Sequence, residues 1–216
     1  TYFKTDRIAT IVVTERNFSP DLFEVKISNT DGVIPAIGEW KTVVAGKNGD
    51  ETKHTAQIVF GSDGDYSVSI SCVDKALNPG EDPIVGESLA PWAFTIDKTA
   101  PVVNVTYDNN NVRNGNYYKK QRIATIFVTE HNFETGRIVV NLKATDNGTE
   151  VVLPTVSEWT SKGDLHTATI TYAADAFYTF DFDYMDKAGN AIEDLPEQTF
   201  YVDKTNPVLS IENIVD

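Results

Sequence analysis

Residues 122–130 read RIATIFVTE, and residues 7–15 read RIATIVVTE. In the first stretch Ala124, Ile126 and Val128 fall on one side of an extended chain, because successive side chains of a β-strand point to opposite faces. Such a period of two is typical of a strand that lays one face on a hydrophobic core. Both stretches are therefore predicted to be strands of a sheet.

The two strands belong to a repeat that extends through the chain. Four pairs of segments match in the same order, with offsets of 115, 112, 112 and 106 residues, and the offsets drift only where loops differ in length. Such a repeat is evidence for two copies of one structural module. The pairs are YFKTDRIATIVVTERNF from Tyr2 with YYKKQRIATIFVTEHNF from Tyr117, HTAQIVF from His54 with HTATITY from His166, DYSVSISCVDKALNP from Asp65 with FYTFDFDYMDKAGNA from Phe177, and FTIDKTAPVVNV from Phe94 with FYVDKTNPVLSI from Phe200.

The repeat also predicts the domain boundaries. Its period is close to the length of one β-sandwich domain, and a chain of 216 residues fits two such domains. We expect a first module at residues 1–99, which lacks its first strand because nothing in it matches residues 101–115. A second module should cover 100–205, and residues 206–216 match the first strand of a third copy. The chain thus reads as part of a longer array.

The remaining segments favour an all-β fold. Tyr178, Phe180, Phe182 and Tyr184 share one face of a predicted strand, and the first copy has Cys72 where the second has Tyr184. Turn residues such as Asp31-Gly32 and Asn147-Gly148 separate the strand-like runs, and no segment shows a sustained helical period. The predicted architecture is two tandem antiparallel β-sandwiches, with Cys72 as a small core residue.

Two motifs occur in both copies and resemble those of bacterial immunoglobulin-like repeats from surface and adhesin proteins. They are a joint of the form Val/Ile-Asp-Lys-Thr-x-Pro at residues 96–101 and 202–207, and a turn Asp-Lys-Ala-x-Asn at 74–78 and 186–190. The resemblance covers nearly the whole chain. It implies immunoglobulin-like modules that usually act as spacers and sometimes as ligand-binding tips.

Composition excludes some classes of function. Hydrophobic residues make up 41% of the chain, enough for real cores, and the net charge is −14. The acidic excess is shared, since residues 1–99 carry 15 acidic and 9 basic side chains and residues 100–216 carry 17 and 9. Both halves would repel phosphate backbones and anionic membranes, so we expect neither nucleic-acid binding nor adhesion to such membranes by charge. No stretch approaches the roughly 18 apolar residues of a membrane helix, so we expect no membrane insertion of this segment. A single cysteine permits no disulfide within the chain and is compatible with an exported bacterial protein.

The acidic surface makes calcium the candidate cofactor. In a sandwich of this topology, the loop after the second strand, the last hairpin loop and the entering linker meet at one pole. In the second module this would gather hard oxygen ligands of the kind that calcium takes in sets of six to eight. They are Asp97, Glu130, Asn132, Asp186 and Asn190.

A purely structural interpretation stays open for this set. Asp186 and Asn190 can hydrogen-bond their own turn, as aspartate and asparagine often do, and Glu130 can pair with a lysine. The sequence also lacks the dense Asp-x-Asp spacing of dedicated calcium loops. The first module has the matching residues but not the entering linker, so a site there should be incomplete; those residues are Glu15, Asn17, Asp74 and Asn78.

Nothing in the sequence indicates an enzyme. His54 and His166 occupy equivalent positions in the two copies, and a residue repeated in every module is more often structural than catalytic. No nucleophile elbow, phosphate loop or zinc-ligand pair is present. Trp92 occurs only in the first copy, beside a longer loop, and is the candidate residue for binding a ligand such as a sugar, although packing in the core is the alternative.

We therefore expect a non-catalytic spacer of a bacterial cell-surface or secreted repeat protein, such as an adhesin. The alternative is a module that binds carbohydrate or host protein, and it predicts exposed aromatics in the copy-specific loops 79–93 and 104–116. The expected partners are neighbouring modules of the same chain. Because the first module lacks a strand that the C-terminal tail matches, self-association through that tail is a further hypothesis.

Overall fold

The computed structural model describes residues 1–81, 84–85, 88–89 and 92–212, and the chain divides into two compact units, Thr1–Thr99 and Ala100–Asp216. Strands dominate both units, and the helices among the described residues are three short 3-10 segments. The all-β prediction is thus confirmed. No helix within the described ranges is both long and apolar enough to cross a membrane.

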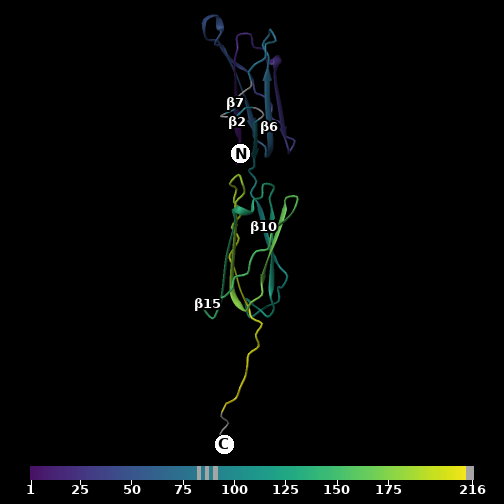
Figure 1. Cartoon of the computed structure of the whole chain (residues 1–216), viewed down its shortest axis with the longest axis vertical. Helices are drawn as coiled ribbons and strands as arrows, with labels where there is room; N and C mark the ends of the chain where they lie inside the picture. Colours follow the sequence, from purple (N-terminus) through teal and green to yellow (C-terminus); the bar gives the residue numbers. More distant parts are fainter. Residues whose placement is uncertain (82–83, 86–87, 90–91, 213–216) are drawn as a thin grey trace. The chain divides into compact units, whose positions relative to one another are not determined.

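The second unit, which opens with the strand β10 in Figure 1, consists of two sheets. The first sheet has the order β10 (Val102–Tyr107), β13 (Arg122–Thr129), β17 (Leu165–Tyr172) and β16 (Thr160–Lys162). The second has the order β11 (Val112–Arg113), β12 (Tyr117–Tyr118), β19 (Gln198–Val202), β18 (Ala176–Tyr184), β14 (Ile138–Asp146) and β15 (Thr149–Glu150), and the 3-10 helix η3 (Thr135–Arg137) precedes β14.

This strand order is that of an immunoglobulin domain. If β10, β13, β14, β16, β17, β18 and β19 are lettered A to G, one sheet runs A-B-E-D and the other places G beside F and F beside C. All but one of the strand pairs in this unit are antiparallel, as predicted. The exception is β12, which pairs in parallel with β19 through Tyr117 opposite Tyr201 and Tyr118 opposite Val202.

The core of the second unit lies between the inner faces of these sheets. The face predicted from β18 is buried along its whole length, and β13 contributes its predicted alternate residues from the facing sheet. Val103, Val105 and Tyr107 of the edge strand β10 pack against the same cluster. The buried members include Ala124, Ile126, Val128, Tyr178, Phe180, Phe182 and Tyr184.

The first unit repeats this order without the strand A. One sheet contains β2 (Arg7–Thr14), β5 (Lys53–Phe60) and β4 (Lys41–Val43), and the other contains β1 (Tyr2–Phe3), β9 (Trp92–Ile96), β6 (Gly64–Cys72) and β3 (Phe23–Asn29). The short strands β7 (Ile84–Val85) and β8 (Ser88–Leu89) pair with each other, and η1 (Pro20–Leu22) and η2 (Lys47–Gly49) are the remaining 3-10 segments.

Among the described residues, the core of the first unit is smaller than that of the second. Its buried cluster includes Phe60, Tyr66, Phe94 and Ile96, and Ile70 packs against it while staying partly exposed. Cys72, at the end of β6, is only half-buried. The C-terminal segment of the chain, yellow in Figure 1, forms no strand between residues 203 and 212.

Candidate cation site at one end of the second unit

The turn at residues 186–190 is held by its own aspartate. Asp186 Oδ1 accepts hydrogen bonds from the backbone N–H groups of Gly189 (2.7 Å) and Asn190 (2.9 Å), and Oδ2 accepts from the Asn190 side chain (2.7 Å). The backbone of Asp186 also donates to the carbonyl of Asn190 at 3.0 Å. The structural role foreseen for Asp186 and Asn190 is thus present. An ionised carboxylate offers about four acceptor positions, so three such bonds still leave room for a cation.

Glu130 is fixed in a similar way on the opposite sheet. It follows β13, and its Oε1 accepts the backbone N–H of Asn132 at 2.6 Å. The carbonyl of Glu130 accepts a hydrogen bond from His166 Nε2 at 2.8 Å. Because a carbonyl can only accept, Nε2 carries the proton, and in the neutral ring Nδ1 accepts from the Ser161 hydroxyl at 2.7 Å.

The His166 ring is also held by packing. It stacks on Phe133 with centroids 3.9 Å apart and planes inclined by 7°. The first unit repeats the arrangement, with His54 Nε2 on the Glu15 carbonyl (2.8 Å) and the ring stacked on Phe18. The two histidines therefore position the loop after the second strand, which agrees with the structural role expected for them.

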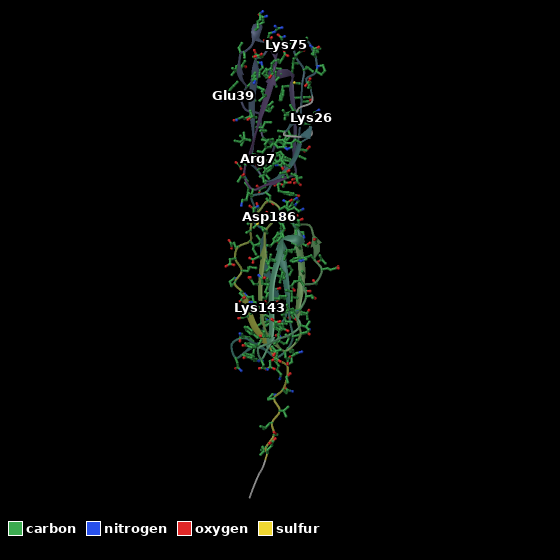
Figure 2. The ribbon with its side chains drawn as sticks, turned by 60° about the vertical axis from the view of Figure 1, so that its left-hand side comes forward. Arg7, Lys26, Glu39, Lys75, Lys143 and Asp186 are labelled. Carbon is green, nitrogen blue, oxygen red and sulfur yellow. The ribbon has the colours of Figure 1, made fainter. Side chains whose placement is uncertain are left out.

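The two carboxylates converge although they come from facing sheets. Glu130 follows β13 and Asp186 follows β18, and carboxylate oxygens of the two residues lie within 4.8 Å of each other. Both are buried, with 6% of Glu130 and none of Asp186 exposed. Asp186 lies at the end of the unit opposite to the one from which the C-terminal segment leaves (Figure 2). Two buried carboxylates this close repel each other, and a cation between them relieves that repulsion.

Four of the five predicted ligands are thus neighbours within the second unit, since Asn132 and Asn190 are bonded to the two acids. The fifth, Asp97, belongs to the first unit and directly follows β9. Its backbone N–H donates to Phe3 at 2.9 Å, its Oδ1 accepts the backbone N–H of Thr99 at 3.2 Å, and 6% of the residue is exposed.

The matching residues of the first unit adopt the same local geometry. Asp74 accepts from the backbone of Asn78 and from its side chain, both at 2.8 Å, and Glu15 accepts from the backbone of Asn17 at 2.7 Å. The Asn78 side chain lowers the pKa of Asp74. Unlike Asp186 and Glu130, however, Asp74 and Glu15 are only partly buried. The turn is therefore a property of both copies, whereas the enclosed pair of carboxylates is found in the second.

A second pair of contacts, which the sequence analysis did not identify, lies at the other end of each unit. The Thr99 hydroxyl donates to Asp63 Oδ2 at 2.8 Å, and the equivalent Thr205 hydroxyl donates to Asp175 Oδ2 at 2.6 Å. The joint motif Asp-Lys-Thr therefore fastens the exit segment of each sandwich to its own hairpin. The matched aspartates, 112 residues apart, were the signal in the sequence that could have identified this contact.

Trp92, the predicted ligand-binding residue, packs inside the first unit. Its ring lies 4.5 Å from Phe94 and 6.2 Å from Phe60, and the residue is partly buried against the core. A sugar-binding role for it stays a prediction. Residues 82–83, 86–87 and 90–91 of the copy-specific loop lie outside the described residues, and in the other such loop Tyr107 is directed to the core.

No protein-family model and no curated protein sequence matches the chain. Solved structures resemble it at low identity. The Escherichia coli adhesin FdeC is 15% identical over 94% of this chain and 61% of its own, with a TM-score of 0.39. A three-domain titin fragment (I67–I69) is 8% identical over 93% of this chain and 60% of its own, with a TM-score of 0.30. The titin pair A164–A165 is 9% identical over 93% and 90%, with a TM-score of 0.29.

The chain spans about three fifths of the length of the first two of these structures. TM-scores at this level support no argument about function. The immunoglobulin-like assignment rests on the strand order within each unit, and the chain is a tandem of two such modules.

Proposed function

We propose that this chain is a non-catalytic spacer segment of a bacterial cell-surface or secreted repeat protein. Its task would be to hold other parts of that protein at a fixed distance and orientation. The observation that carries the proposal is the construction of the joint between the two units.

The joint leaves very little free backbone. Thr99 is bonded to Asp63 of the first unit, and Val102 is already paired with Thr129 in the second. Only Ala100 and Pro101 lie between these fixed residues. Proline has a nearly fixed φ, and the residue before a proline is restricted to extended conformations. A joint of this kind supports a limited range of orientations, as a spacer requires.

The segment that leaves the second unit makes the same contacts as the segment that leaves the first. Thr205 is bonded to Asp175, and the backbone N–H of Asp203 donates to Tyr118 just as that of Asp97 donates to Phe3. Asn206 and Pro207 then take the positions of Ala100 and Pro101. Repetition of a joint, in contrast to repetition of a ligand pocket, favours a role in connecting modules at regular intervals.

We assign calcium a supporting role at the joint. The covalent chain brings Asp97 to within five residues of Val102, which pairs with Thr129, the neighbour of Glu130. Five extended residues reach at most about 18 Å, so the Asp97 carboxylate can approach Glu130 and Asp186. Calcium bound by these three acids, with amide, carbonyl and water oxygens completing the shell, would link the linker to the second sandwich.

Single-molecule stretching tests the spacer proposal. A load-bearing spacer should resist force and then unfold in two separate steps, one per unit. Each step should release roughly 300 Å of chain, because about 100 residues span at most about 340 Å when extended. Gradual extension without distinct steps would contradict a load-bearing role.

A further inference from the structure

The second unit carries a row of aromatic side chains on the outer face of its six-stranded sheet. The strand register places Tyr117 and Phe177 on either side of Tyr201. The rings of Tyr117 and Tyr201 lie 4.3 Å apart with planes inclined by 6°, and the Phe177 ring lies 4.6 Å from that of Tyr201. The residues next to these three along the strands belong to the core, so the row itself faces outward.

A groove of about 630 Å³ lies beside this row. Its volume is in the range of ligand-binding sites. All of the residues that line it belong to the second unit, and the hairpin of β14 and β15, the latter labelled in Figure 1, forms part of its wall. Three aspartates line the groove, Asp146, Asp175 and Asp203, and none of its described lining residues is a lysine or an arginine.

The three aspartates retain acceptor positions. Oδ1 of Asp146 and Oδ1 of Asp203 each accept one hydrogen bond from a residue close by in the sequence, at 3.1 and 3.2 Å, out of about four that a carboxylate can accept. Oδ1 of Asp175 is buried and has no hydrogen-bond partner in the described part of the chain. Lys204 Nζ lies 3.6 Å from it, too far for a hydrogen bond. The groove therefore favours a cationic group that donates hydrogen bonds.

The aromatic row is specific to the second copy. By the offsets of the repeat, Tyr201 corresponds to Thr95. Phe177 corresponds to Asp65, and the Thr95 hydroxyl donates to Asp65 Oδ1 at 2.5 Å. The sandwich thus folds with a polar pair at these positions, so its packing does not require the rings. Tyr2 and Asp65 are exposed in the first unit, from which the chain continues into the second, so exposure of this row does not depend on a chain end.

The inner face of the same sheet shows which cation such rings hold. The buried guanidinium of Arg122 lies over the rings of Tyr107, Tyr118 and Phe200, at 3.7, 4.0 and 4.7 Å from their centroids. Two of these rings directly adjoin, along the chain, the tyrosines of the outer row. A guanidinium stacks on aromatic rings and also binds carboxylates through two parallel hydrogen bonds. An arginine side chain therefore matches both the aromatic and the acidic parts of the groove.

We propose that the groove beside the aromatic row binds an arginine side chain from a basic segment of a partner polypeptide. The guanidinium packs against Tyr201 and its neighbours and donates hydrogen bonds to Asp146 and Asp175. The acidic excess of residues 100–216, with 17 acidic and 9 basic side chains, attracts such a segment. This binding role adds to the spacer role and does not depend on calcium at the joint.

An NMR titration of the full chain tests the proposal. The probe is a five-residue peptide in which glycine and arginine alternate, and its control is the same peptide with citrulline in place of arginine. Citrulline has nearly the shape of arginine but no charge. The arginine peptide should shift the amide signals of residues 145–148 and 175–177. Its affinity should exceed that of the citrulline peptide by about tenfold, since both the cation–π contact and the charged hydrogen bonds are lost.

Three variants of the full chain locate the site. Tyr201→Thr installs the residue that the first unit has at this position and should weaken binding of the arginine peptide about tenfold. Tyr2→Thr makes the same change in the first unit and should bind like the wild type. Asp146→Asn removes one charge from an exposed hairpin and keeps Oδ1 as an acceptor, so it should leave the fold intact and weaken binding severalfold.

The proposal is overturned if the arginine and citrulline peptides bind equally well, or if the wild type shows no shifts at millimolar peptide. Wild-type affinity in both Tyr201→Thr and Asp146→Asn would also overturn it. A neutral oligosaccharide such as maltoheptaose provides the last comparison. Shifts of the same residues with this sugar, but not with the arginine peptide, would mean that the groove binds carbohydrate and that the proposal is wrong.

Discussion

At the residue scale, the repeated turn requires a residue with a positive φ, and the two copies place different residue types there. Gly189 in the second unit has a φ of 92°, and the equivalent Leu77 in the first has a φ of 68°. The left-handed region costs a residue with a Cβ roughly 1–2 kcal/mol relative to glycine. Leu77 is 70% exposed, so burial of its side chain offsets little of this strain.

We predict that Gly189→Ala destabilises the second unit by about 1 kcal/mol, measured as a lower midpoint in calorimetry. An added Cβ meets nothing within 4 Å, so backbone strain is the sole cause. Gly136→Ala is the matched control, because its Cβ is equally unobstructed and its φ is not in the left-handed region. If both variants melt alike, strain at the turn is not the cause.

The hydrogen bond from Thr205 to Asp175 predicts that the stability of the second unit depends on pH. The hydrogen bond from Thr205 is the main reason why the pKa of Asp175 is lowered. A carboxyl whose folded pKa is depressed stabilises the fold above its unfolded pKa of about 3.9, and that stability is lost as the pH falls through the folded value. Thr205→Val should therefore lower the free energy of unfolding of the second unit at pH 7 by about 1 kcal/mol, which calorimetry records as a lower melting midpoint.

This difference should shrink below pH 4, where the carboxyl becomes protonated in both proteins. Thr205→Ser keeps the hydroxyl and should melt like the wild type at pH 7. A Thr205→Val deficit that is as large at pH 2.5 as at pH 7 would show that the lost methyl packing, rather than the charged hydrogen bond, had been measured.

Several side-chain roles could be read from the sequence, and others could not. The alternation of Tyr178, Phe180, Phe182 and Tyr184 predicts their burial because period-two patterning is local. The bond between Thr205 and Asp175 joins residues 30 positions apart, and no local pattern predicts such a contact. The sequence predicted that Glu130 and Asp186 lie close together only because an immunoglobulin-like sandwich topology was assumed.

At the element scale, the described part of each unit contains one short parallel pair, between an early strand and the last strand. In the second unit Tyr201 donates its backbone N–H to Asn116 at 2.9 Å, and Asp203 donates to Tyr118 at 3.0 Å. In the first, Thr95 donates to Thr1 and Asp97 to Phe3, both at 2.9 Å. Tension applied through the two ends of a unit shears these bonds together, because the paired strands run in the same direction.

We predict that Tyr201→Pro lowers the force needed to unfold the second unit in stretching experiments. Proline removes the N–H that binds Asn116 and so deletes one of the hydrogen bonds across the pair. Tyr201→Ala is the control, because it keeps the N–H while losing the ring that stacks on Tyr117 at 4.3 Å. Equal forces for the alanine and proline variants would assign the resistance to ring packing.

The sequence predicted most of the long strands but not these short ones. Strands such as β13 and β18 run for eight or nine residues and show a clear alternation. β12 contains only two residues, which is too short for any period to be visible. Its parallel pairing with β19 is decided by the path of the chain around the sandwich rather than by local preference.

At the scale of the whole molecule, calcium should stabilise the chain through the second unit. With a dissociation constant of about 0.1–1 mM, as in extracellular calcium modules, 1 mM calcium contributes about 0.4–1.4 kcal/mol. For a domain of this size that corresponds to roughly 2–10 °C in the midpoint. Thermal melts in chelator and in calcium measure the shift.

Glu130→Gln should abolish this shift while keeping an oxygen that accepts the Asn132 N–H. Glu15→Gln makes the same change at the matching position of the first unit and should leave the shift intact. Superimposed melts of the wild type with and without calcium would show that Asp186 and Asn190 act only within their turn. The stiffness of the joint would then come from its short backbone alone.

The most direct test of the spacer account is the distribution of distances between the two units. Spin labels can be placed on the exposed strand positions of Lys26→Cys in the first unit and Lys143→Cys in the second, with Cys72→Ser to remove the native thiol. A joint of two restricted residues predicts one narrow distance distribution in calcium. A broad distribution, both in calcium and in chelator, would mean that the units pivot freely and would contradict the account.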